Sequence, residues 1–83
     1  MPQHKSAAKR VRQTEKKRLA NRLHRSRMRT MMKRLRATED KEEAVGLLNE
    51  VKAYLDRLAS KRIIHKNKAA NYKSELEQRV NTL

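Results

Sequence analysis

The 83-residue sequence contains no cysteine, no phenylalanine and no tryptophan, and it has one glycine and one proline. Without cysteine the chain forms neither a disulfide nor a thiolate metal site, which fits a reducing compartment. A single glycine excludes a glycine-rich loop that could cradle phosphates. With tyrosine as its only large aromatic residue, the chain can build only a thin, aliphatic core, and a domain this small buries a limited fraction of its surface.

Long apolar runs and catalytic clusters are also missing. No run approaches the roughly 18 residues of a transmembrane helix, and no apolar segment follows the basic N-terminus as in a secretion signal. The histidines His4, His24 and His65 lie far apart and lack partners at ligand spacing. The acids between Glu39 and Glu43 fit a solvated helix start. We therefore predict no enzyme, no metal site, no cofactor, no small-molecule substrate and no membrane association.

Positive charge is what the sequence has in excess, with 23 Lys and Arg residues against nine Asp and Glu residues and a net charge of +14. Residues 1–36 hold 14 basic residues and one acidic residue. Residues 37–60 hold three basic and six acidic residues, and residues 61–83 hold six basic and two acidic residues. Charge spread this widely indicates a nucleic-acid partner ahead of an anionic membrane. The acidic middle segment is expected to face solvent or to brace the other two.

Residues Lys5 to Arg36 are predicted to form one basic helix about 48 Å long, because the segment lacks Gly and Pro and is rich in helix formers. Residues 1–4 lack periodicity and include Pro2, so we expect a disordered tip. Apolar residues are sparse as far as Leu23, so this half should pack on no protein core. Beyond it, apolar residues recur at helical spacing and should pack. They are Met28, Met31, Met32 and Leu35.

Two further helices are predicted. Thr38 to Lys41 forms the first break, and Asp40 with Glu43 has capping-box spacing. Gly46, inside the second helix, either allows close approach of a neighbouring helix or is a tolerated surface glycine. The apolar face of the second helix is Ala44, Leu48, Val51, Leu55 and Leu58, widened by Leu47 and Tyr54. The third helix runs from about His65 to Asn81, with Ala69, Tyr72, Leu76, Val80 and Leu83 on one face.

These stripes predict an all-α fold, an antiparallel three-helix bundle with an extended, projecting N-terminal helix. We expect one domain over residues 1–83, with residues 1–27 as a projecting basic helix and residues 28–83 as the bundle. Like charges on the projection repel one another, so its stability requires a polyanion. Cations in nearly every direction suit a cleft with phosphates on several sides, as in folded RNA, rather than a flat membrane. The alternative is a charged helix that is merely solvated. Such helices usually alternate positive and negative residues, which this segment does not.

A second basic cluster lies at the predicted start of the third helix, where free backbone N–H groups favour an anion. Its members are Lys61, Arg62, His65, Lys66, Asn67 and Lys68. His65 and Asn67 either hydrogen-bond a nucleotide or have capping and surface roles. Tyr54 and Tyr72 could stack on bases. Their helical spacing with leucines instead favours a place at the edge of the core, with the hydroxyl exposed to water.

The chain resembles the bacterial small-subunit ribosomal protein twenty family along essentially its whole length. Two groups of residues carry the resemblance. The first is Lys5-Ser6-Ala7, Lys9-Arg10, Thr14-Glu15-Lys16, Arg18, Asn21, Arg25-Ser26, Met28-Arg29-Thr30 and Lys33. The second is the specific string Ile64-His65-Lys66-Asn67-Lys68-Ala69-Ala70, followed by Lys73-Ser74 and Leu76. One departure is Arg62, where family members often have a glycine that stops the helix.

The resemblance implies a three-helix bundle that binds small-subunit ribosomal RNA, chiefly the 5′ domain, and reaches the long stem near the 3′ end. It also implies a place in the cytoplasmic ribosome, or an organelle equivalent, with few protein contacts. A basic DNA-binding or nucleoid-type protein is the main alternative, and a membrane-surface or acidic-protein partner is the third. The predicted RNA-binding residues are Lys5, Ser6, Lys9, Arg10, Arg12, Lys16, Lys17, Arg18, Asn21, Arg22, Arg25, Ser26, Arg29, Lys33, His65, Lys66, Asn67, Lys68 and Lys73.

Overall fold

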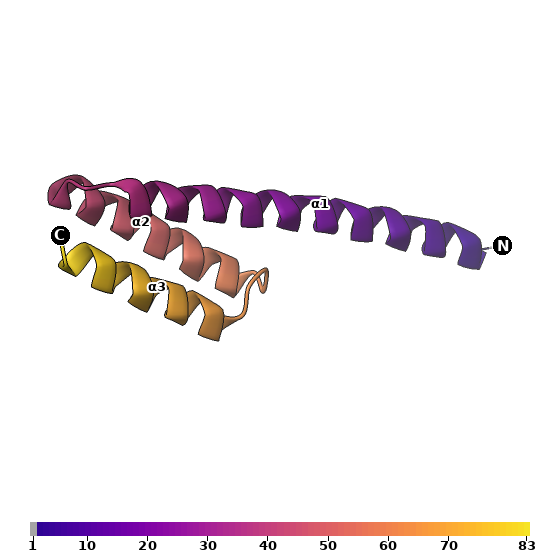
Figure 1. The fold of residues 1–83 in the computed structure, drawn as a ribbon. Coiled ribbons are helices and arrows are strands. Elements are labelled where there is room, and N and C mark those ends of the chain that lie inside the picture. The colour runs from indigo at the N-terminus through magenta and orange to yellow at the C-terminus, as the bar shows by residue number, and fades with distance from the viewer. Residues whose placement is uncertain (1) are drawn as a thin grey trace.

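The computed structural model describes residues 2–83, with side chains from residue 7 onward. The described chain forms α1 (Pro2–Ala37), α2 (Lys41–Ser60) and α3 (Lys66–Asn81) and contains no strand. α2 runs back along the end of α1, and α3 runs back along α2, so consecutive helices are antiparallel (Figure 1). This arrangement confirms the predicted all-α class and the antiparallel three-helix bundle with an extended first helix.

The first helix begins at Pro2, three residues before the predicted start. The prediction of a disordered tip is therefore wrong for residues 2–4, whereas Met1 lies outside the described residues. Proline is excluded from a helix interior, but at the first helical position its missing N–H has no intrahelical partner to lose and its φ already suits a helix. The 36 residues of α1 give it a length of about 54 Å.

One aliphatic core joins the three helices and the α2–α3 loop. Its side chains are at most 8% exposed: Met28, Met32 and Leu35 from α1, Ala44, Leu48, Val51, Leu55 and Leu58 from α2, Ile63 and Ile64 from the loop, and Ala69, Leu76 and Val80 from α3. All five positions predicted for the apolar face of α2 are buried. Leu83 is the exception among the predictions for α3, being 41% exposed, because the helix ends at Asn81 and no longer directs it inward.

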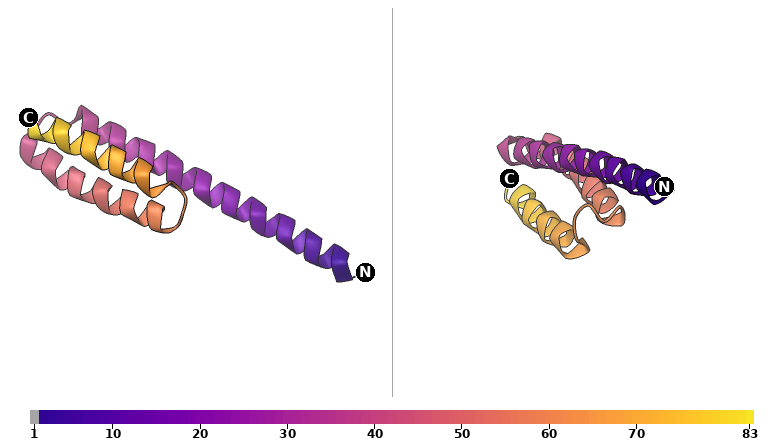
Figure 2. Two further views of the ribbon diagram at one scale, coloured as in Figure 1. Left: turned by 90° about the horizontal axis from the view of Figure 1, so that it is seen from below. Right: turned by 90° about the vertical axis from the view of Figure 1, so that its right-hand side faces the viewer.

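The N-terminal half of α1 extends beyond the bundle (Figure 2), and the molecule is 62 Å along its longest axis. Its apolar side chains Val11, Leu19 and Leu23 are 61%, 58% and 72% exposed. Among the side chains described, from residue 7 onward, the first buried one in α1 is Met28. In the described part of the chain, this half of α1 therefore packs on no protein core, as its sparse apolar residues predict.

The start of α2 differs in detail from the predicted capping box. Asp40 occupies the N-cap position, with φ −75° and ψ 122°, but its side chain makes no capping hydrogen bond. Glu42 and Glu43 lie in the first turn, where carboxylates are attracted to the positive end of the helix without a specific bond. Gly46 is exposed, and a Cβ there would meet nothing within 4 Å. Of its two interpretations, the tolerated surface glycine is the correct one.

α2 ends in a Schellman motif centred on Arg62, which has φ 61° in the left-handed region. The Arg62 N–H donates to the Ala59 carbonyl at 3.0 Å, and the Ile63 N–H donates to the Leu58 carbonyl at 2.9 Å. Ile63 and Leu58 are both buried, which supplies the apolar contact of this motif. The turn therefore has the geometry that usually takes a glycine, although an arginine stands here.

Replacing Arg62 with glycine is expected to stabilise the fold by about 1 kcal/mol, because a left-handed backbone is costly for a residue with a Cβ. The melting temperature should rise by about 4–8 °C for a domain of this size, as measured by circular dichroism. Arg62→Ala is the control, because it removes the same charge and keeps the Cβ. If the glycine and alanine variants melted at the same temperature, the cost would not lie in the backbone.

Candidate nucleic-acid interface

Residues 7–27 of α1, here called the basic projection, present cations on every side of the helix. Successive residues are rotated by about 100°, so neighbours in sequence point in different directions. Glu15 is the only acid among them. None of the ion pairs found among the described residues involves the projection. Its exposed cations are Lys9, Arg10, Arg12, Lys16, Lys17, Arg18, Arg22, Arg25 and Arg27.

The same surface carries the predicted polar residues. Asn21 is half-buried and Ser26 is exposed. The Ser26 carbonyl accepts a hydrogen bond from the Thr30 hydroxyl at 3.1 Å. Two further predicted RNA-binding residues, Lys5 and Ser6, lie at positions whose side chains fall outside the described residues. The density of positive charge, with Glu15 as the single acid in residues 7–27, gives this helix a field that attracts polyanions.

Two clusters that are far apart in sequence meet where α1 passes the α2–α3 loop. The Arg25 guanidinium donates from Nη2 to the Ile63 carbonyl at 3.1 Å. A pocket of about 360 Å³ opens at this point, here called the junction pocket. It is lined by Arg25, Arg29, Ile63, Ile64, His65 and Lys68. Three cations surround two nearly buried isoleucines without an acid among the lining residues, so the pocket favours an anionic group.

His65 has a structural role at the edge of this pocket. It is the N-cap of α3, and its Nδ1 accepts a hydrogen bond from the Asn67 N–H at 3.1 Å. A backbone N–H can only donate, so Nδ1 must be unprotonated and a neutral ring carries its hydrogen on Nε2. The sequence left open whether His65 binds a nucleotide or caps the third helix, and the structure shows the capping role. It leaves the Nε2–H of this exposed residue as a donor.

The root of the basic projection is fixed by His24 and Tyr54. The His24 Nδ1 lies 2.8 Å from the Tyr54 hydroxyl, and the Arg27 guanidinium lies 5.9 Å from the centroid of the tyrosine ring. Tyr54 is half-buried against the core, which agrees with its prediction as a core edge. Its hydroxyl is bonded within the chain and a cation lies over its ring, so it is not a free platform for a base.

The remaining predicted residues are dispersed. Lys33 is exposed on α1, and Lys66 and Asn67 are exposed in the first turn of α3. Lys73 is half-buried and donates to the Asp56 carboxylate at 2.7 Å, so its ammonium is directed towards α2. The structure thus brings Arg25, Arg29, His65 and Lys68 together in one pocket but does not place Lys73 with them.

Sequence reasoning did not predict the apolar and backbone parts of the junction pocket. Ile63 and Ile64 lie in a loop, where helical periodicity gives no signal, and their contribution depends on a contact between residues 38 positions apart. Over the described residues, no group of three His, Cys, Asp or Glu side chains is placed to hold a metal ion. None of the described helices is both long enough and apolar enough to cross a bilayer.

Comparison with known proteins gives matches along the whole chain. A family model described as "Ribosomal protein S20" matches residues 2–81. The small ribosomal subunit protein bS20 of Salinibacter ruber is 59% identical over 83 residues, covering 100% of this chain and 99% of the relative. The protein of that name from Parabacteroides distasonis is 54% identical with the same coverage. The one from Amoebophilus asiaticus is 51% identical and is covered completely.

Proposed function

We propose that this chain, which belongs to the ribosomal protein S20 family, is a structural component of the small ribosomal subunit and binds small-subunit ribosomal RNA directly. Its place in the cell is then the ribosome, and its role is not enzymatic. One observation supports direct binding above the others. The basic projection carries cations on all sides and, among the described residues, no ion pair neutralises them.

The form of this charge favours folded RNA as the partner. A helix that lies on a membrane needs an apolar face, whereas the apolar side chains of the projection are few and form no continuous face. Folded RNA surrounds an inserted helix with phosphates on several sides. Arginine pairs with a phosphate through two parallel hydrogen bonds, and lysine acts as a point charge. In this proposal the predicted RNA-binding residues contact mainly phosphates, and Asn21 and Ser26 contact phosphates or ribose hydroxyls.

The two parts of the chain have different tasks in this proposal. Residues 28–83 form the bundle that holds the helix, and residues 1–27 reach into the RNA. The junction pocket gives the bundle an RNA contact of its own at the root of the projection. Arg25 and Lys9 are 16 residues apart on one helix, or about 24 Å, so the protein is long enough to bridge RNA segments. The proposed segments are the 5′ domain and the long stem near the 3′ end, with few protein contacts.

Competition between two nucleic acids tests this proposal. A labelled transcript of bacterial small-subunit ribosomal RNA is bound to the protein at about 150 mM salt and is challenged with unlabelled transcript or with duplex DNA of equal phosphate concentration. We expect the RNA to compete at least about tenfold better, because its folded clefts contact the helix on several sides. Equal competition would instead support a general DNA-binding role.

A further inference from the structure

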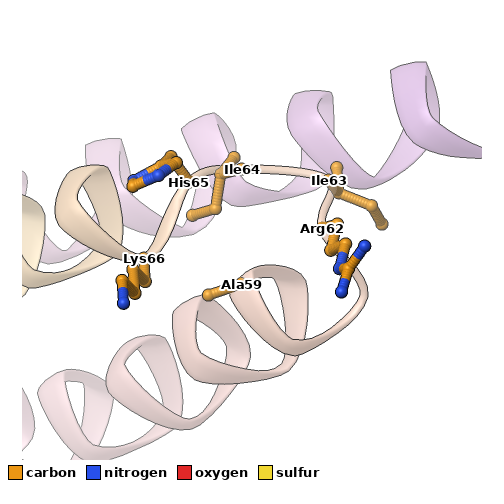
Figure 3. A pocket seen from close by; sticks show the side chains of 6 residues that line it. All are labelled: Ala59, Arg62, Ile63, Ile64, His65 and Lys66. Atoms are coloured by element: carbon orange, nitrogen blue, oxygen red, sulfur yellow. The ribbon is translucent and has the colours of Figure 1, made fainter.

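A second pocket lies at the α2–α3 loop, and its volume is about 450 Å³. Its lining residues are Ala59, Arg62, Ile63, Ile64, His65 and Lys66. Arg62 and Lys66 extend on either side of Ala59, one from each end of the loop (Figure 3). The volume lies within the range of small-ligand sites. We call it the loop pocket. The function proposed above counts its lining residues His65 and Lys66 among the RNA contacts but assigns nothing to the cavity itself.

The loop pocket combines apolar walls with planar and positively charged groups. Ala59, Ile63 and Ile64 supply aliphatic surface, and the two isoleucines are 7% and 8% exposed as part of the core. The Arg62 guanidinium is planar and exposed, and no hydrogen bond or ion pair to it is present among the described residues. A bare phosphate would gain nothing from the aliphatic walls. A flat heterocycle would contact the walls and the guanidinium plane together.

The backbone at Arg62 also marks this site. A residue with a Cβ rarely adopts φ 61°, and such strained positions cluster at ligand-binding sites, although here the same φ also ends α2. The two hydrogen bonds of the Schellman motif hold the backbone of the loop, so the direction of the Arg62 Cα–Cβ bond follows from the fold. The strain is thus located at the residue whose guanidinium lines the pocket.

We propose that the loop pocket holds one unpaired nucleobase of the bound RNA, stacked on the Arg62 guanidinium and resting on Ala59 and Ile64. Lys66 lies on the other side of Ala59. In this proposal its ammonium contacts the phosphate of the same nucleotide. Splayed, unpaired bases are the elements of RNA that proteins bind by stacking on arginine planes. This inference rests on the proposed RNA binding, which it makes more specific.

Arg62→Lys tests the proposal, because lysine keeps the charge and the Cβ but has no plane on which a base can stack. With a transcript of bacterial small-subunit ribosomal RNA as the probe, we expect about a tenfold loss of affinity at fixed salt, typical of losing one stacking contact. The slope of log affinity against log salt should stay unchanged, since no charge is removed. One base should also lose its protection from chemical modification at the Watson–Crick edge.

Two other variants complete the test. Arg57→Lys makes the same exchange on the exposed part of α2 and should leave affinity and base protection unchanged. Ala59→Leu fills the loop pocket without changing charge and should reproduce the loss caused by Arg62→Lys, with circular dichroism to verify the fold. If Arg62→Lys binds the transcript as tightly as the parent, the nucleobase site is wrong. If the parent itself shows no salt-dependent binding, the proposed function fails instead.

Discussion

The affinity of this protein for small-subunit ribosomal RNA, its proposed partner, is expected to fall by about three to five orders of magnitude when salt is raised from about 50 to about 200 mM. This magnitude corresponds to roughly six to ten neutralised phosphates, because each one releases counterions whose return is favoured by salt. The basic projection alone has nine exposed cations, and the junction pocket adds others from α1 and α3. Fluorescence anisotropy of a labelled ribosomal RNA transcript over a salt series measures the slope.

Neutral variants of the projection assign that slope to its cations. Changing Lys9, Arg12 and Lys16 together to glutamine should lower the slope by about two to three, at roughly 0.7–0.9 per phosphate contact. Lys41→Gln with Arg57→Gln removes two exposed cations from the acidic α2 and should hardly change it. Affinity that stayed level across the salt series would rule out phosphate contacts as the main source of binding.

Truncating Leu55 to alanine is expected to remove about 2–5 kcal/mol from the free energy of unfolding, the usual loss for a leucine in a packed core. Leu55 is 0% exposed and lies on α2, which packs against both other helices. A domain of 83 residues has a total stability of about 4–12 kcal/mol, so this loss is a large fraction of it. The melting temperature should fall by about 10 °C or more.

Val45→Ala is the matched control for that experiment. Val45 lies on the same helix, is also aliphatic and is 42% exposed, so its truncation should change stability by no more than about 0.5 kcal/mol. The chain has no cysteine and therefore no disulfide that could compensate for a weakened core. Similar melting temperatures for the two variants would show that the buried face of α2 does not determine the stability of the bundle.

The helices were predictable from local signals: α1 from its helix formers and its lack of Gly and Pro after Pro2, and α2 and α3 from their apolar periodicity. Ala44, Leu48, Val51, Leu55 and Leu58 repeat at alternating intervals of four and three, and all five are buried. The methionine stripe after residue 27 likewise marks where α1 enters the core. The sequence was a poorer guide at the chain ends. The role of Pro2 depends on its position within the first turn, and the exposure of Leu83 depends on where α3 stops.

Neither pocket could be predicted from the sequence, because both depend on the path of the chain around the α2–α3 loop. The junction pocket requires Arg25 to meet the Ile63 carbonyl, a contact fixed by how α1 passes the loop and by no local pattern. Arg62 stood out in the sequence as a departure from a usual glycine. The consequence, an arginine held at φ 61° over an apolar pocket, follows only when the path of the chain after α2 is known. Loops of this kind lack the repeating signal that helices carry.

The short connections of the bundle set how fast it folds. Three residues join α1 to α2 and five join α2 to α3, so most contacts of the core form between helices that are adjacent in sequence. Chains dominated by such local contacts fold in microseconds to milliseconds, because little entropy is lost in closing their loops. We therefore expect the bundle to fold within about milliseconds, before or during assembly of a ribonucleoprotein. In the proposed RNA complex, the slow rearrangements would then be those of the RNA and of the basic projection around an already folded bundle.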